Sequence, residues 1–143
     1  LPPSYTHLLD RIVAHSESYA SMLEGGWKTE LYSLTKQDLA LMDIPGMRRL
    51  VQPIFSYILH AITVLYKTQK VYMDRNQPHI LKYSVSTGHT GVELHHDRCD
   101  ITANLVLSRK SSYRGGGTYI PEVGKVLRIE HGEFLLHPVS WVM

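Results

Sequence analysis

The first part of the chain places apolar residues three or four positions apart, which is the period of an amphipathic helix. Charged and small polar residues fall between them. The pair Gly25-Gly26 follows and predicts the end of this helix, because glycine readily adopts the backbone conformation that closes a helix. The apolar positions of this first predicted helix are Leu8, Leu9, Ile12, Val13, Ala20 and Leu23.

A second and longer helix is predicted after Ile44-Pro45-Gly46, which interrupts the pattern. Pro53 is compatible with this helix because it falls in the opening turns. A short helical segment is also expected at 39–42, with Thr35 and Asp38 as its N-terminal cap. The long apolar stripe should lie against a sheet and consists of Val51, Ile54, Phe55, Ile58, Leu59, Ile62, Leu65 and Tyr66.

From His79 onward the apolar period changes to two, which indicates strands. Glycine and proline separate the alternating runs, as expected for an antiparallel core with tight turns. Helices followed by short strands predict an α+β fold in one domain over 1–143, with supporting helices at 1–75 and the β core at 76–143. The expected strands cover 80–85, 92–95, 101–108, 118–120, 126–129 and 133–137.

Composition restricts the classes of function. A chain of 143 residues, 43% hydrophobic and 20% charged, has the size and balance of a globular domain. Its net charge of +2 gives no basis for nucleic-acid binding. The longest apolar run, at 50–66, is too short and too polar to span a membrane. Cys99 is the single cysteine, so an internal disulfide framework is excluded.

The sequence His95-His96-Asp97 carries the candidate chemistry. On an extended segment the side chains alternate, so His95 and Asp97 share one face while His96 takes the other. One imidazole and one carboxylate, with a second imidazole from elsewhere, form the facial triad of non-heme Fe(II) oxygenases. Alone, this pattern is more often a surface turn with a histidine beside a carboxylate. The prediction that His95 and Asp97 are two ligands of an iron ion therefore depends on the segments that accompany them.

Residues 79–138 resemble the catalytic domain of the Fe(II)- and 2-oxoglutarate-dependent dioxygenases, in particular the prolyl and lysyl hydroxylase branch. The matching segments occur in the family's order and spacing. They are Leu81-Lys82-Tyr83, His95-His96-Asp97, the strand-like segment 101–107, the glycine turn 113–118 that holds Gly115-Gly116-Gly117, and the segment 132–138 that ends in His137-Pro138.

The resemblance implies a double-stranded β-helix (jelly roll) that holds Fe(II) at its open end. It implies a reaction in which 2-oxoglutarate and O₂ are consumed, a C–H bond is hydroxylated and succinate and CO₂ are released, with ascorbate as a supporting reductant. The substrate class would be a protein side chain or a small molecule. Tyr83 could hydrogen-bond the cosubstrate, although a core tyrosine is an equal alternative, and Asn104 could contact it from the face opposite Ile101 and Leu105.

The sequence departs from the family pattern at its C-terminal end. In the family a histidine ligand and then a basic residue that binds 2-oxoglutarate follow the segment matching His137-Pro138, whereas here the sequence given ends at Met143. We therefore expect an incomplete β-helix, weak iron binding and poor turnover. His137 is an alternative third ligand. Val92 replaces a tyrosine common in prolyl hydroxylases, which weakens a specifically prolyl assignment.

Two other interpretations stay open at this point. One is a truncated isoform or pseudo-enzyme that pairs with a partner through an open sheet edge. The other is a cupin-like domain that binds a different metal through His95, Asp97 and His137.

Overall fold

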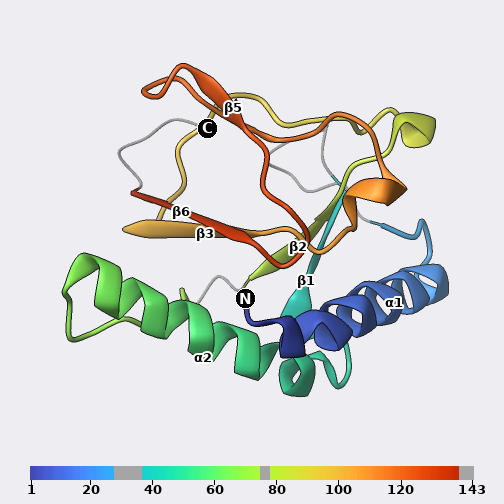
Figure 1. Cartoon of the computed structure of the whole chain (residues 1–143). Helices are drawn as coiled ribbons and strands as arrows, with labels where there is room; N and C mark the ends of the chain where they lie inside the picture. Colours follow the sequence, from blue (N-terminus) through green and yellow to red (C-terminus); the bar gives the residue numbers. More distant parts are fainter. Residues whose placement is uncertain (28–36, 75–77, 139–143) are drawn as a thin grey trace.

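The protein is described here by a computed structural model that covers residues 1–27, 37–74 and 78–138. It is a mixed α+β structure of two helices and antiparallel strands in small sheets (Figure 1). The helices are α1 (Thr6–Met22) and α2 (Met47–Tyr66). The strands are β1 (Gln37–Ala40), β2 (His79–Lys82), β3 (Ile101–Leu105), β4 (Thr118–Ile120), β5 (Lys125–Leu127) and β6 (Phe134–Pro138).

Helix α1 confirms the first predicted helix. Its buried positions are Leu9, Ile12, Ser16 and Ala20, which follow the helical period along one face. The helix ends where Leu23 turns to an extended backbone, and Gly25 follows with a φ of 81°. A positive φ is accessible to glycine at little cost. Gly25 and Gly26, which both have a positive φ, therefore mark the end of the helix.

Helix α2 confirms the second predicted helix. The chain enters it through Gly46, whose φ of 77° lies in the left-handed region. Its fully buried residues repeat at helical spacing along the whole length of the helix. They are Met47, Val51, Ile54, Ile58 and Ile62.

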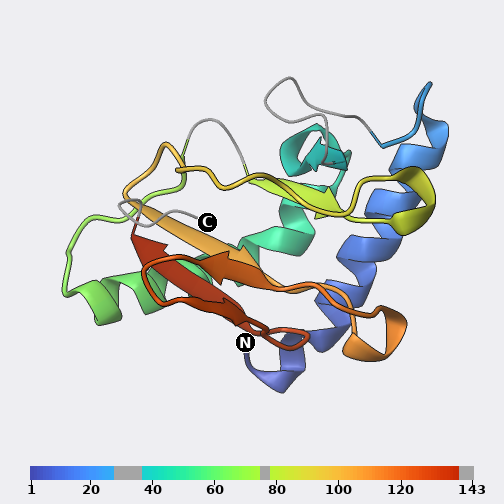
Figure 2. The same ribbon diagram turned by 90° about the horizontal axis from the view of Figure 1, so that it is seen from above.

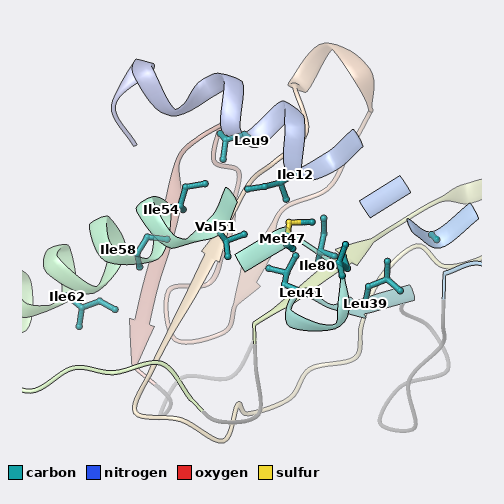
Figure 3. Close-up of a cluster of buried hydrophobic side chains, with 12 residues drawn as sticks. Leu9, Ile12, Leu39, Leu41, Met47, Val51, Ile54, Ile58, Ile62 and Ile80 are labelled. Carbon is teal, nitrogen blue, oxygen red and sulfur yellow. The ribbon is translucent and has the colours of Figure 1, made fainter. Parts of the chain in front are cut away.

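The main core forms where α2 meets α1 and strands β1 and β2 (Figure 3). Met47 is completely buried, and Leu9 and Ile12 from α1 belong to the same cluster. Leu39 and Ile80 contribute from two strands that pair with each other. Burial of this apolar surface is the principal favourable term in the folding of the domain.

The strands form three antiparallel pairs: β1 with β2, β3 with β6, and β4 with β5. In the pair β3–β6, Thr102 lies opposite His137 and Asn104 lies opposite Leu135. The described strands do not close into a barrel. The α+β class and the antiparallel pairing are therefore confirmed.

The two faces of the β3–β6 pair differ in character. Ile101, Leu105, Phe134 and Leu136 pack against the core that contains α2. Because side chains alternate along a strand, Thr102, Asn104, Leu135 and His137 take the opposite face. Both views place β3 and β6 over α2, and β5 lies on the far side of them from the helix in Figure 1 (Figures 1 and 2).

Two expected elements are wrong. The segment expected to be helical at 39–42 instead holds strand β1 and a short 3-10 helix at Leu41–Asp43, because Leu39 pairs with Ile80 far along the chain. The first 75 residues therefore contain a strand as well as helices. The expected capping residue Thr35 lies outside the described residues. The segment expected as a strand at 92–95 has no regular structure. Strands β2 and β3 also end earlier than expected, at Lys82 and Leu105.

Helix α1 is joined to the β3–β6 pair by polar contacts of Asp10. One carboxylate oxygen accepts a hydrogen bond from the Arg109 guanidinium at 2.7 Å. The other lies 3.6 Å from Nε2 of His131. These contacts hold α1 against the ends of β3 and β6.

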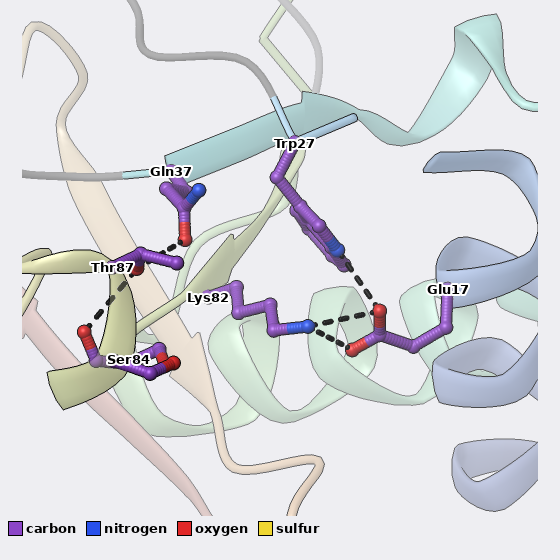
Figure 4. Close-up of polar contacts among 7 residues, drawn as sticks. Glu17, Trp27, Gln37, Lys82, Ser84 and Thr87 are labelled. Carbon is purple, nitrogen blue, oxygen red and sulfur yellow. Dashed lines mark hydrogen bonds and ion pairs between the residues drawn. The ribbon is translucent and has the colours of Figure 1, made fainter. Parts of the chain in front are cut away.

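A second polar cluster joins α1 to β2 (Figure 4). The Lys82 ammonium donates to the Glu17 carboxylate at 2.7 and 2.9 Å, and Nε1 of Trp27 donates to the same carboxylate at 3.0 Å. Lys82 also lies 5.3 Å from the centre of the Trp27 ring. Partial burial acts to raise the pKa of Glu17, but the hydrogen bonds from Lys82 and Trp27 outweigh it and leave this pKa lowered.

We predict that Gly117→Ala destabilises the domain by about 2–4 kcal/mol, the sum of a backbone cost and an overpacking cost. The φ of Gly117 is 118°, and a Cβ there would stand 2.6 Å from Cγ1 of Val126 and 2.9 Å from the carbonyl of Leu127. Gly115→Ala is the matched control, because Gly115 has a φ of 79° but nothing within 4 Å of the added atom. It should cost only about 1 kcal/mol. Equal losses in urea unfolding would contradict the steric argument.

We also predict that the contribution of Glu17 to stability depends on pH. Because its pKa is lowered in the folded state, the contribution is present above the unfolded value of 4.5 and is lost as the pH falls through the folded pKa. Glu17→Gln should lower the free energy of unfolding at pH 7 by at most about 1 kcal/mol, since the side chain is 46% exposed and screened by solvent. At pH 3 the difference from the unmodified protein should shrink. Glu24→Gln serves as the control.

Candidate functional site

The imidazole of His95 is oriented by its own backbone. Nδ1 of His95 donates a hydrogen bond to the carbonyl oxygen of Glu93 at 2.8 Å. In the neutral ring this places the proton on Nδ1 and the free lone pair on Nε2. Histidines that bind a metal commonly donate their other ring N–H to a carbonyl or carboxylate in this way.

The carboxylate of Asp97 faces that nitrogen. Oδ1 of Asp97 lies 3.5 Å from Nε2 of His95. Its second oxygen, Oδ2, accepts a hydrogen bond from the hydroxyl of Thr102 at 2.5 Å. Thr102 lies on β3, so the strand fixes the rotation of the carboxylate. The sulfur of Cys99 lies 3.2 Å from the same hydroxyl.

A positive charge between the two atoms would stabilise the arrangement of His95 and Asp97. A lone pair on Nε2 and a carboxylate oxygen at 3.5 Å repel each other unless Nε2 carries a proton or both atoms bind a cation. Two donors about 2.1 Å from a first-row metal stand roughly 3.0 Å apart at a right angle and about 3.4 Å apart at the tetrahedral angle. The observed separation is close to this range. The side chains are 43% and 26% exposed, so the pair is open to solvent.

The structure thus brings His95 and Asp97 together as predicted, although the predicted reason is incorrect. The segment 91–97 is not a regular strand, so alternation does not align the two side chains. Their approach follows from two hydrogen bonds instead, one from His95 to Glu93 and one from Thr102 to Asp97. These two supporting residues were missed in the sequence. The sequence offers one indication that Thr102 could support the site, which is its place on the face of the predicted strand opposite Ile101.

His137 is the most buried of the candidate site residues. It is 1% exposed, its Nδ1 lies 3.2 Å from the carbonyl of Pro138, and its Nε2 has no hydrogen-bond partner among the described residues. It lies opposite Thr102 in the β3–β6 register. Within 1–27, 37–74 and 78–138, no three histidine, cysteine or carboxylate side chains gather at a position that could hold a metal. The structure therefore does not bring His137 together with His95 and Asp97.

Tyr83 lies just beyond β2, on the sheet formed with β1. Partial burial and the nearby Asp38 carboxylate raise the pKa of Tyr83 above its ordinary value. Asp38 is itself only 1% exposed, and Nδ1 of His79 lies 3.4 Å from its Oδ2. The Asp38 carboxylate thus influences Tyr83 electrostatically. A role of Tyr83 toward a cosubstrate stays a prediction.

Asn104 lies on the same face of β3 as Thr102, two residues further along the strand. Ile101 and Leu105 pack on the core, and alternation along β3 places Asn104 on the other side. Ala103, expected with the apolar set, is exposed. A contact between Asn104 and a cosubstrate stays a prediction.

The residues present fit part of an iron site. His95 and Asp97 are donors of the types found in the facial triad of non-heme iron enzymes, and they converge. The third donor does not come from the described residues. The cupin-like alternative with His137 is not assembled in this part of the chain for the same reason.

Comparisons with protein families, with curated proteins and with solved structures found no match for this chain. Neither α1 nor α2, the two α-helices of the described segments, has the length and apolar character needed to cross a membrane.

Proposed function

We propose that this chain is a domain of the Fe(II)- and 2-oxoglutarate-dependent dioxygenase superfamily, of the hydroxylase type. The proposed reaction converts a substrate C–H, 2-oxoglutarate and O₂ to a substrate C–OH, succinate and CO₂. The observation that carries the proposal is the separation of 3.5 Å between Nε2 of His95 and Oδ1 of Asp97. Each side chain is oriented by a hydrogen bond of its other polar atom, Nδ1 of His95 and Oδ2 of Asp97.

In this proposal His95 and Asp97 hold the iron, which when bound activates O₂ and binds 2-oxoglutarate. Glu93 fixes the tautomer of His95, and Thr102 fixes the rotation of the Asp97 carboxylate. Tyr83 and Asn104 are the candidates for cosubstrate contact, and ascorbate would keep the iron reduced. The finer fold proposed is a double-stranded β-helix, of which the pairs β3–β6 and β4–β5 would form part. The proposal of a double-stranded β-helix is based on the resemblance of residues 79–138 to the catalytic domain of these dioxygenases.

A second candidate is an interaction module that does not turn over substrate. It is favoured by the strand pairing, because β3 and β6 each pair with a single strand within the described segments. A free strand edge offers backbone groups to an incoming strand. Metal binding by His95 and Asp97 without formation of succinate would favour this candidate over the enzyme.

We predict that the metal-free protein binds one Fe(II), or Co(II) as a spectroscopic substitute, through His95 and Asp97. His95→Ala and Asp97→Ala should each weaken metal affinity by about tenfold or more, because even the loss of a residue that only supports a ligand costs that much. The measurement is an anaerobic titration followed by calorimetry and by the visible spectrum of Co(II). Succinate formed from 2-oxoglutarate with Fe(II), ascorbate and O₂ gives a separate readout of turnover.

His96→Ala is the matched control for this titration. His96 is an exposed imidazole directly between the two proposed ligands. Its replacement should change the affinity less than about twofold, since it removes a histidine of the same segment that is not assigned to the metal. If the His96 variant loses as much affinity as the His95 variant, or if no variant differs from the unmodified protein, the proposed site is incorrect.

We further predict that Thr102→Val weakens metal binding by about 10- to 100-fold without changing any ligand. The substitution keeps the shape of the side chain but removes the hydroxyl that donates to Oδ2 of Asp97. Thr102→Ser retains the hydroxyl and should restore most of the affinity. Equal affinities of the valine and serine variants, measured by the same titration, would show that the hydrogen bond does not orient the carboxylate.

A further inference from the structure

A groove lies where α1 meets the start of α2. Its volume is about 510 Å³. One wall is formed by residues of α1 that lie on the same helix face. The other wall is formed by the loop that leads into α2 and by the first residues of α2. The lining residues are Arg11, Ala14, His15, Ser18, Pro45, Gly46, Arg49 and Leu50.

The charge in this groove has one sign. Arg11 from α1 and Arg49 from α2 both line it, and no carboxylate does. Neither guanidinium has an ion pair within the described segments, whereas Lys82 and Arg109 each contact a carboxylate at 2.7 Å. Two like charges that share a groove repel each other, and an anion between them would remove that repulsion.

The backbone adds to the positive potential. Helix α2 is 20 residues long and starts at this groove, and no side chain of the described residues caps its first turn. The amides of Met47 and Arg49 bond to the carbonyls of Ile44 and Gly46, so the start of the helix favours an anion through the helix dipole. His15 joins the two sides of the groove, because its Nε2 donates a hydrogen bond to the carbonyl of Pro45 at 2.6 Å. The hydroxyl of Ser18 on the same wall is a further donor.

We propose that this groove binds a small phosphate-bearing ligand through Arg11 and Arg49. A planar guanidinium donates two parallel hydrogen bonds to phosphate oxygens, and two guanidiniums from different helices can hold one phosphate group from two sides. The volume of the groove leaves room for an organic group beyond the phosphate. This site is separate from His95 and Asp97 and does not depend on the function proposed for them.

The test is a titration of the full chain with inorganic phosphate and with phenyl phosphate, followed by NMR shifts of backbone amides in 11–18 and 46–50, with ionic strength held constant by NaCl. We expect saturable shifts confined to these segments. Arg11→Gln combined with Arg49→Gln should weaken binding at least about tenfold, since charge-assisted hydrogen bonds are lost. Tighter binding of phenyl phosphate would identify a phosphate monoester, and equal binding would identify the free anion.

Arg48→Gln is the matched control. Arg48 is an exposed neighbour of Arg49 that carries the same charge but does not line the groove. Its variant should bind within about twofold of the unmodified protein, because general surface attraction is screened by the salt. Shifts that do not saturate, or an equal loss of affinity in the Arg48 variant and the double variant, would overturn the proposal. Arg11 and Arg49 are exposed, so thermal unfolding should confirm that both variants fold.

Discussion

The antiparallel ladder between β3 and β6 is the constraint on which both the core and the candidate site depend. One face of the ladder packs Ile101 and Leu136 onto the core that contains α2. The alternation that creates this face also turns Thr102 outward, where its hydroxyl holds Asp97. A slip of one residue in the register would exchange the two faces, so burial of the apolar side chains fixes the position of the donor to Asp97.

The candidate site illustrates how a loop can gain definite geometry without being part of a sheet. His95 and Asp97 lie on a segment with no regular structure, but each is held by a local hydrogen bond, to Glu93 and from Thr102. The result is an imidazole nitrogen and a carboxylate oxygen that face each other at 3.5 Å in reach of solvent. An arrangement of this kind is suited to a cation, because without one the two atoms repel each other unless His95 is protonated.

The parts of the fold that follow from local periodicity could be predicted from the sequence. The stripe from Val51 to Ile62 gave α2 correctly because one face of that helix is buried along its whole length. The segment at Leu39 was assigned to a helix because its pairing with Ile80 is a contact between distant parts of the chain, which no local pattern reveals. The same limit applies to the site: the spacing of His95 and Asp97 was visible, whereas the hydrogen bond from Thr102 depends on how the loop folds back on β3.

Asp10 couples elements that are far apart in the sequence. Its two carboxylate oxygens reach Arg109, beyond the end of β3, and His131, just before β6. Both contacts lie at the same end of the β3–β6 pair, so α1 and the segments that flank the two strands meet at one carboxylate. Strand β3 therefore carries Thr102, which supports the Asp97 carboxylate, near its start and leads to the Arg109 partner of α1 beyond its end.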